Sequence, residues 1–209
     1  MKTLKSYKFE ILLTAVLLQL VYPFFSLLFI VEQDKVHLAS FAILMMASLL
    51  IAKRKSPKLL VLLFGSMGVI GLLYGCLENE GLTIYLRIYG ICFFYLTLMY
   101  ILIRNFLDSK KISLQVVMGA VSGYLVIGFI GASTIEMMDF HHPGSFGLSD
   151  TSESFDYYYF SFISLVTVGY GDIVPLSSAA KSLTIFISVI GQFYMAVGIA
   201  SFVGKFMSK

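Results

Sequence analysis

The sequence predicts an all-α membrane protein, and three features of the chain lead to that fold class. Hydrophobic residues make up 58% of the 209 residues and charged residues only 13%, which is about half the charged share of a soluble domain. The apolar residues gather in runs close to the roughly 20 residues that a membrane-spanning helix needs. The charged residues lie in short strips between these runs, as loops between transmembrane helices would.

The apolar runs predict six transmembrane helices. They lie at residues 9–31, 36–52, 57–77, 81–107, 113–135 and 178–206. The first run follows the basic start MKTLKSYK, but it is too long for the apolar core of a signal peptide, and no cleavage-site pattern follows it. We therefore expect this run to be a membrane span rather than a leader.

The charges of the loops predict the orientation. Twelve of the 15 Lys and Arg residues lie at the termini or in alternate loops. Because basic loops stay on the cytoplasmic side, we expect a multi-pass protein of the cell membrane with both termini in the cytoplasm. Ten of the 12 Asp and Glu residues lie in the opposite loops, where they would concentrate cations near an opening.

The segment between the fifth and sixth runs predicts a re-entrant half-helix. Residues 137–153 are polar and turn-rich and indicate an outer loop. The following stretch FDYYYFSFISLV, residues 155–166, is apolar and aromatic but too short to cross a bilayer. Ser154 and Asp156 suit its N-terminus, by capping and by complementing the helix dipole.

The hexapeptide TVGYGD, residues 167–172, follows this half-helix. Irregular backbone at membrane depth is tolerated only where it is buried in protein or lines a water-filled path. Gly169 and Gly171 can adopt positive φ without a Cβ penalty. Their alternation with Val168 and Tyr170 allows successive carbonyl groups to face one way, which makes a cation site. The Thr167 hydroxyl would add oxygen at the inner end.

The stretch SLVTVGYGDIVP, residues 164–175, resembles the filter region of the potassium channel superfamily. The resemblance covers the outer helix 113–135, the pore helix 155–166, the filter and the inner helix 178–206. It implies that K⁺ ions in the filter are coordinated by carbonyl oxygens and one hydroxyl, and that four copies assemble as a homotetramer. The residues implied as ligands are Thr167, Val168, Gly169 and Tyr170, with Gly171 completing the filter.

The resemblance also implies roles outside the filter strand. Asp172 would be held behind the filter by the pore helix, where Tyr159 stands at the position of an aromatic donor. Some bacterial members pair this aspartate with a glutamate at the position of Ile163, so filter-based inactivation is not implied here. Gly191 stands where the family often has a hinge glycine.

One face of the inner helix suggests a gate. Met195, Ile199 and Val203 recur every four residues. We interpret Ile199 and Val203 as an apolar constriction that closes by dewetting. The alternative is that this stripe packs against the fifth helix.

The resemblance implies two domains. Residues 1–107 would form a four-helix domain in the position of a voltage sensor, and residues 108–209 the pore domain. Arg87 and Arg104 are the basic residues of the fourth helix, which therefore lacks the arginine array of a voltage sensor. The sequence thus predicts a bacterial-type channel with six helices and one pore loop but little sensor-driven gating. Arg87 is interpreted as a side chain that reaches the outer interface.

Other functions are left open or disfavoured. The alternatives to a potassium-selective channel are a non-conducting modulatory subunit and a less selective cation channel. A fused-repeat uptake transporter would need further pore loops, and no intramembrane His, Glu or Asp cluster or nucleophile motif suggests an enzyme. We expect membrane lipid as a partner, no organic cofactor and no nucleic acid, and we leave a separate regulatory subunit open. Sensing of pH or metal by His141 and His142 is also open, and Cys76 and Cys92 are interpreted as packing residues.

Overall fold

The computed structural model describes residues 7–75, 81–109, 113–148 and 154–207, and of residues 199–207 the backbone only. The chain divides into two compact units, Met1–Gly123 and Tyr124–Lys209. The described residues form α-helices joined by turns, with no strand among them. The boundary between the units falls inside one long helix, α7 (Leu114–His141).

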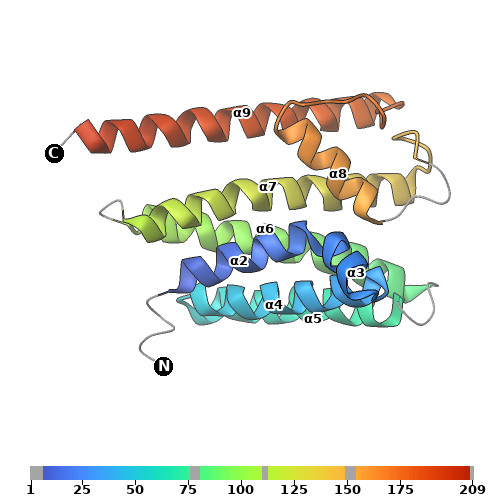
Figure 1. Cartoon of the computed structure of the whole chain (residues 1–209), viewed down its shortest axis with the longest axis horizontal. Coiled ribbons are helices and arrows are strands. Elements are labelled where there is room, and N and C mark those ends of the chain that lie inside the picture. Colours follow the sequence, from blue (N-terminus) through green and yellow to red (C-terminus); the bar gives the residue numbers. More distant parts are fainter. Residues whose placement is uncertain (1–6, 76–80, 110–112, 149–153, 208–209) are drawn as a thin grey trace. The chain divides into compact units, whose positions relative to one another are not determined.

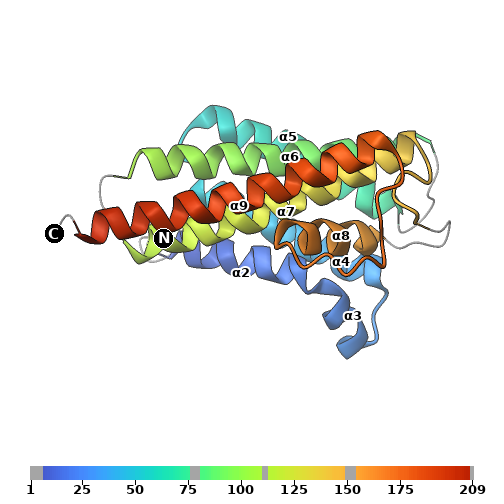
Figure 2. The ribbon, with the colours of Figure 1, turned by 90° about the horizontal axis from the view of Figure 1, so that it is seen from above.

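The first unit is a bundle of helices. It contains α2 (Lys8–Leu20), α3 (Tyr22–Phe29), α4 (Gln33–Ile51), α5 (Lys55–Gly75), α6 (Leu82–Leu107) and the start of α7. Helix α2 packs on α4, α4 on α5, and α5 on α6. Helices α2 and α4 run side by side in Figure 1, and α5 and α6 in Figure 2. The ends of α4 and α6 therefore lie with the start of α5 at one end of this unit.

Glycines let α5 and α6 approach closely. A Cβ atom added at Gly90 would lie 2.6 Å from the backbone nitrogen of Gly68, and one at Gly71 would collide with the backbone of Arg87. Small residues at such a crossing replace side-chain bulk by backbone contact, which is the usual packing of helices in membranes. Beside this crossing Phe41 and Phe94 are fully buried, with their ring centroids 4.9 Å apart.

The predicted first span, residues 9–31, is wrong as a single straight helix. Helix α2 ends at Leu20, α3 begins at Tyr22, and the two axes are bent by 68°; in Figure 2, α3 points away from α2. Pro23 near the start of α3 explains the break, because it lacks an N–H and its ring clashes with the preceding turn. Tyr22 is buried at the bend, where its ring stacks on His37 at 4.5 Å.

The arginines of α6 differ in environment. Arg104 is exposed near the end of the helix. Arg87 is half-buried and its Nε atom is buried within the first unit. The interpretation of Arg87 as a side chain that reaches the outer interface stays a prediction.

The second unit consists of the rest of α7, the short helix α8 (Ser154–Leu165) and α9 (Ser178–Met207). The prediction that α7 ends at residue 135 and that a loop begins at 137 is wrong, because the helix continues to His141. Asp139 on this additional turn accepts a hydrogen bond of 3.1 Å from the Tyr157 hydroxyl of α8. The contact helps to explain why the chain stays helical there.

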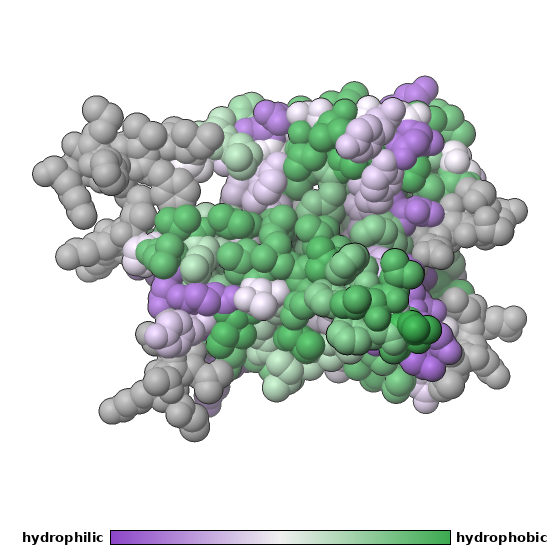
Figure 3. Space-filling view, in the orientation of Figure 1, coloured by the Kyte–Doolittle hydropathy of each residue, from purple (hydrophilic) through white to green (hydrophobic). Residues whose placement is uncertain are grey.

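The helices are suited to a membrane. Five of those in the described part are long and apolar enough to cross a bilayer, and up to six if α2 and α3 together count as one span. Hydrophobic residues, green in Figure 3, cover most of the face shown there. The chain is thus an all-α, multi-pass membrane protein.

Candidate functional site

The candidate site is the backbone that follows α8. This helix has 12 residues, which corresponds to about 18 Å and is too short to cross the hydrocarbon core. Its start at Ser154 and end at Leu165 lie within one residue of the prediction. Beyond Leu165 the chain leaves the helix and enters the stretch 167–172, which is exposed in the single chain.

The end of α8 is fixed by hydrogen bonds. Each of its last four carbonyl groups accepts a bond, as helix ends require. The donors are the backbone N–H groups of residues 166–169, the Ser188 hydroxyl of α9 and, at 3.5 Å, the Tyr124 hydroxyl of α7. The Ile163 carbonyl accepts two of them, from the N–H groups of Val168 at 2.9 Å and Gly169 at 3.3 Å. Helix α8 thereby directly holds the start of the stretch 167–172.

The carbonyl groups of the filter are available to a ligand. Within the described part of the chain, no hydrogen bond uses the carbonyl oxygen of Thr167, Val168, Gly169 or Tyr170. The N–H groups of residues 167–169 are instead bonded to α8. This division directs the donors into the protein and leaves a series of acceptors, which suit a cation.

The filter backbone alternates in conformation. Thr167, Gly169 and Gly171 have φ values of 60°, 54° and 81°, whereas Val168 and Tyr170 between them do not have positive φ. A Cβ atom at Gly169 or Gly171 would meet nothing within 4 Å. These glycines are therefore required for their backbone angle rather than for space. Positive φ at Thr167 was not predicted, and such a conformation costs a non-glycine residue about 1–2 kcal/mol.

A side-chain contact ties the end of the filter to α8. The Tyr159 hydroxyl donates a hydrogen bond of 2.6 Å to Oδ2 of Asp172, which is the contact that the resemblance implies. This bond is the main reason that the pKa of Asp172 is lowered and that the pKa of Tyr159 is raised to about 12. The pair is therefore a protonated phenol bonded to an ionised carboxylate. Its role in supporting the filter stays a prediction.

The predicted hinge glycine lies at a helix crossing. Gly191 of α9 is buried, and a Cβ atom there would lie 2.6 Å from the Leu165 carbonyl oxygen. The structure thus gives Gly191 a packing function, and hinge motion stays a prediction. Met195 is 45% exposed on α9. Ile199 and Val203 lie in the same helix, but their side chains are outside the described residues, so the gate also stays a prediction.

Two glycines that sequence reasoning did not single out also position α8. A Cβ atom at Gly128 of α7 would lie 2.5 Å from the Phe162 ring, and one at Gly131 would collide with the Ser161 hydroxyl. That hydroxyl is buried and donates a bond of 2.7 Å to the Gly128 carbonyl. The spacing of three between these glycines, inside an apolar run, is the signal that could have indicated a packing face.

The remaining predicted residues lie apart from the filter strand. His141 ends α7 with its Nδ1 atom 2.8 Å from the Met137 carbonyl oxygen, and His142 is exposed in the next turn. Among the residues searched, which are those with described positions, no group of three or more His, Cys, Asp or Glu could hold a metal. Cys92 is buried and forms no disulfide within the described part of the chain, and Cys76 is outside the described residues.

Comparison with known proteins identifies the same region. Residues 120–208 match the model of a protein family described as ion channel. The match extends from α7 through α8 and the filter strand to the end of α9. Searches of curated proteins and of solved structures found no match. The family match supports passive ion conduction by this part of the chain.

Proposed function

We propose that this protein is a potassium-selective channel that conducts K⁺ passively through the TVGYG strand. The observation that carries the proposal is the set of carbonyl oxygens at Thr167, Val168, Gly169 and Tyr170, which no hydrogen bond of the described chain uses. Carbonyl oxygens in this sequence pattern replace the hydration shell of K⁺. The proposed ligands of K⁺ are thus supplied by the backbone, and the side chains hold that backbone in place.

The proposed channel is a homotetramer. One chain supplies one filter strand, and four strands around an axis would surround the ion. In the single chain, Val168 is 50% and Tyr170 73% exposed, although both are filter side chains. On α9, the large apolar side chains of Ile185, Phe186 and Phe193 are more than half exposed. Neighbouring subunits would cover such surfaces.

The proposed gating does not depend on a voltage sensor of the usual kind. The basic residues of α6 are Arg87 and Arg104, whereas steep voltage dependence requires several charges that move through the field. The proposed orientation places both termini in the cytoplasm, on the side of the basic loops. The stimulus would then act through the lipid, the pore, the ions or a separate subunit.

A flux assay tests conduction. Purified protein is reconstituted in vesicles loaded with K⁺ and diluted into a medium with an impermeant cation, and efflux is followed with a K⁺-sensitive dye. The proposal predicts efflux from K⁺-loaded vesicles and little efflux from Na⁺-loaded ones. Equal efflux of both ions would favour the less selective cation channel. No efflux from vesicles whose protein content is verified would favour the non-conducting subunit.

A further inference from the structure

A cleft opens at one end of the first unit. It lies where α4 ends, α5 begins and α6 ends, and its polar lining is Lys53, Arg54, Tyr100, Arg104, Asn105 and Asp108. All of these residues belong to the first unit. They lie at the ends of candidate membrane spans and beside the basic loop that is predicted to face the cytoplasm.

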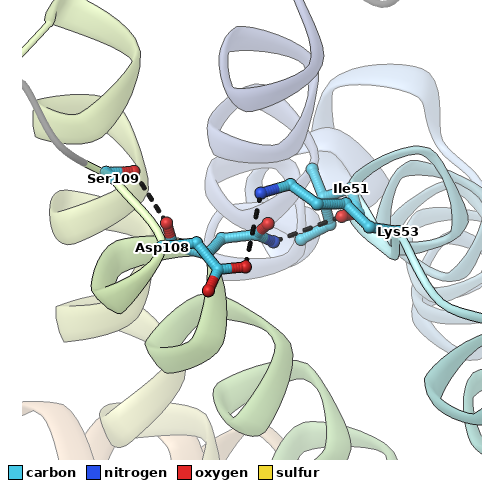
Figure 4. A network of polar contacts seen from close by, with 5 residues as sticks. Ile51, Lys53, Asp108 and Ser109 are labelled. Atoms are coloured by element: carbon cyan, nitrogen blue, oxygen red, sulfur yellow. Dashed lines mark hydrogen bonds and ion pairs between the residues drawn. The ribbon is translucent and has the colours of Figure 1, made fainter.

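The floor of the cleft is held in place by hydrogen bonds. The buried Asn105 of α6 donates a bond of 3.2 Å from its side-chain amide to the Ile51 carbonyl at the end of α4. The Ser109 hydroxyl donates to the Asn105 carbonyl at 2.7 Å. Figure 4 shows Ile51, Lys53, Asp108 and Ser109 within this network. The arrangement fixes α6 against the end of α4 and so fixes the shape of the cleft.

The cleft has an excess of positive charge. Lys53, Arg54 and Arg104 line it, and Asp108 is the single acid among the lining residues of the described chain. The Lys53 Nζ atom lies 3.7 Å from Oδ2 of Asp108, and both side chains are more than half exposed, so this ion pair is weak. The cleft therefore retains cationic groups that could bind an anion.

Arg104 is held in position but keeps hydrogen-bonding capacity. Its Nε donates a bond of 3.1 Å to the Tyr100 hydroxyl, and its guanidinium lies 5.5 Å from the centre of that ring. A guanidinium has five N–H donors in a planar fork that suits the oxygens of a phosphate. The contact with Tyr100 uses one of these five donors. It orients the guanidinium and leaves the other donors for a ligand.

Exposed apolar side chains lie within two residues of the lining residues along the chain. Leu59 of α5 is 67% exposed, and Ile103 and Leu107 of α6 are 46% and 73% exposed. In a membrane these side chains would contact acyl chains. A phospholipid has an anionic headgroup and hydrocarbon chains. A cationic cleft beside exposed apolar side chains, at the end of a membrane span, complements both parts.

We propose that this cleft binds the phosphate headgroup of an anionic phospholipid, on the membrane face that carries the basic loops. Arg54 and Arg104 would contact the phosphate, and Lys53 would join them when its weak pair with Asp108 opens. The exposed apolar side chains close to the lining residues distinguish this ligand from free phosphate, which would gain nothing from Leu59 or Leu107. The inference does not depend on ion conduction, since it concerns the first unit alone.

Lipid binding to the full-length protein tests the proposal. The intact protein in neutral detergent is titrated with phosphatidylglycerol, phosphatidylcholine or inorganic phosphate, and bound lipid is counted by native mass spectrometry. The test variant is Arg54→Gln with Arg104→Gln. The matched control is Lys55→Gln with Lys58→Gln, which removes the same charge from the same end of the unit but from residues outside the lining.

The proposal predicts that phosphatidylglycerol binds more tightly than phosphatidylcholine. Loss of each cleft arginine should raise the dissociation constant for phosphatidylglycerol about fivefold, compared with the lysine control. Asp108→Asn, which removes the single acid of the lining, should tighten it by a similar factor. Equal effects of the arginine and lysine variants, or no effect of Asp108→Asn, would overturn the proposal. Competition by inorganic phosphate as effective as by the lipid would assign the cleft to a soluble anion instead.

Discussion

The conformation of single residues determines whether the filter strand can present its carbonyl groups. Gly169 has φ of 54° and Gly144, in the turn after α7, has φ of 80°, and a Cβ atom at either would meet nothing within 4 Å. Alanine should therefore cost about 1–2 kcal/mol at both positions through backbone strain alone. Only Gly169→Ala should abolish K⁺ selectivity, measured as the ratio of K⁺ to Na⁺ flux. A selective Gly169→Ala channel would contradict the role of this backbone.

The Tyr159–Asp172 contact makes a prediction about pH. The pKa of Asp172 is lowered, so the contact stabilises the protein above the usual carboxyl value of 3.8 and is lost as the pH falls through the lowered pKa. The pKa of Tyr159 is raised to about 12, so the contribution is complete below the usual value of 10.0 and is lost as the pH rises through about 12. Selectivity should therefore not vary through this pair between about pH 5 and about pH 9.

Removal of the Tyr159 hydroxyl tests the contact with Asp172 directly. In Tyr159→Phe the main cause of the shift is gone, so the pKa of Asp172 should rise toward 3.8. Carboxyl NMR titration of labelled protein measures this change. Tyr157→Phe is the control, because its hydroxyl bonds Asp139 on α7 instead. An unchanged pKa of Asp172 in Tyr159→Phe would show that the contact does not form in solution.

At the scale of the helices, the packing of α8 against α9 should be sensitive to one methyl group added at Gly191. A Cβ atom at Gly191 would lie 2.6 Å from the Leu165 carbonyl oxygen, whereas one at Gly198 in the same helix would meet nothing within 4 Å. Overpacking of this kind typically costs about 1–3 kcal/mol. Gly191→Ala should lower the midpoint of thermal unfolding and Gly198→Ala should not. Equal midpoints would mean that the crossing relaxes freely and would favour the hinge function alone.

The sequence predicted an element correctly where a single local pattern indicated it. The prediction failed where a helix breaker or a distant contact acted against the hydropathy pattern. The length of the stretch 155–166 and the glycines after it led directly to α8 and to the irregular backbone that follows it. Pro23 lies inside an apolar run, and hydropathy alone did not indicate that the chain would bend by 68° there. The extension of α7 to His141 depends in part on the contact of Asp139 with Tyr157, which are 18 residues apart. The packing at Gly128 likewise depends on which helix lies opposite, and a single sequence does not contain that information.

At the scale of the whole molecule, assembly and ion binding should be linked. The proposed K⁺ sites are completed only when four strands meet, so K⁺ should stabilise the tetramer over the monomer. Replacement of K⁺ by a large impermeant cation should lower the temperature at which tetramers dissociate, measured by heating followed by native electrophoresis. Na⁺ should stabilise less than K⁺ at equal concentration, which controls for ionic strength. A dissociation temperature that does not depend on the cation would argue against ion sites shared between subunits.

The central claim is that the TVGYG strand selects K⁺, and a bi-ionic reversal potential tests it most directly. Purified protein is inserted into planar bilayers with K⁺ on one side and Na⁺ on the other, and the voltage of zero current is measured in single-channel recordings. The proposed function predicts a reversal potential close to that of K⁺ in the wild type and in Gly144→Ala, and loss of the selective current in Gly169→Ala. A reversal potential near zero in the wild type would contradict it.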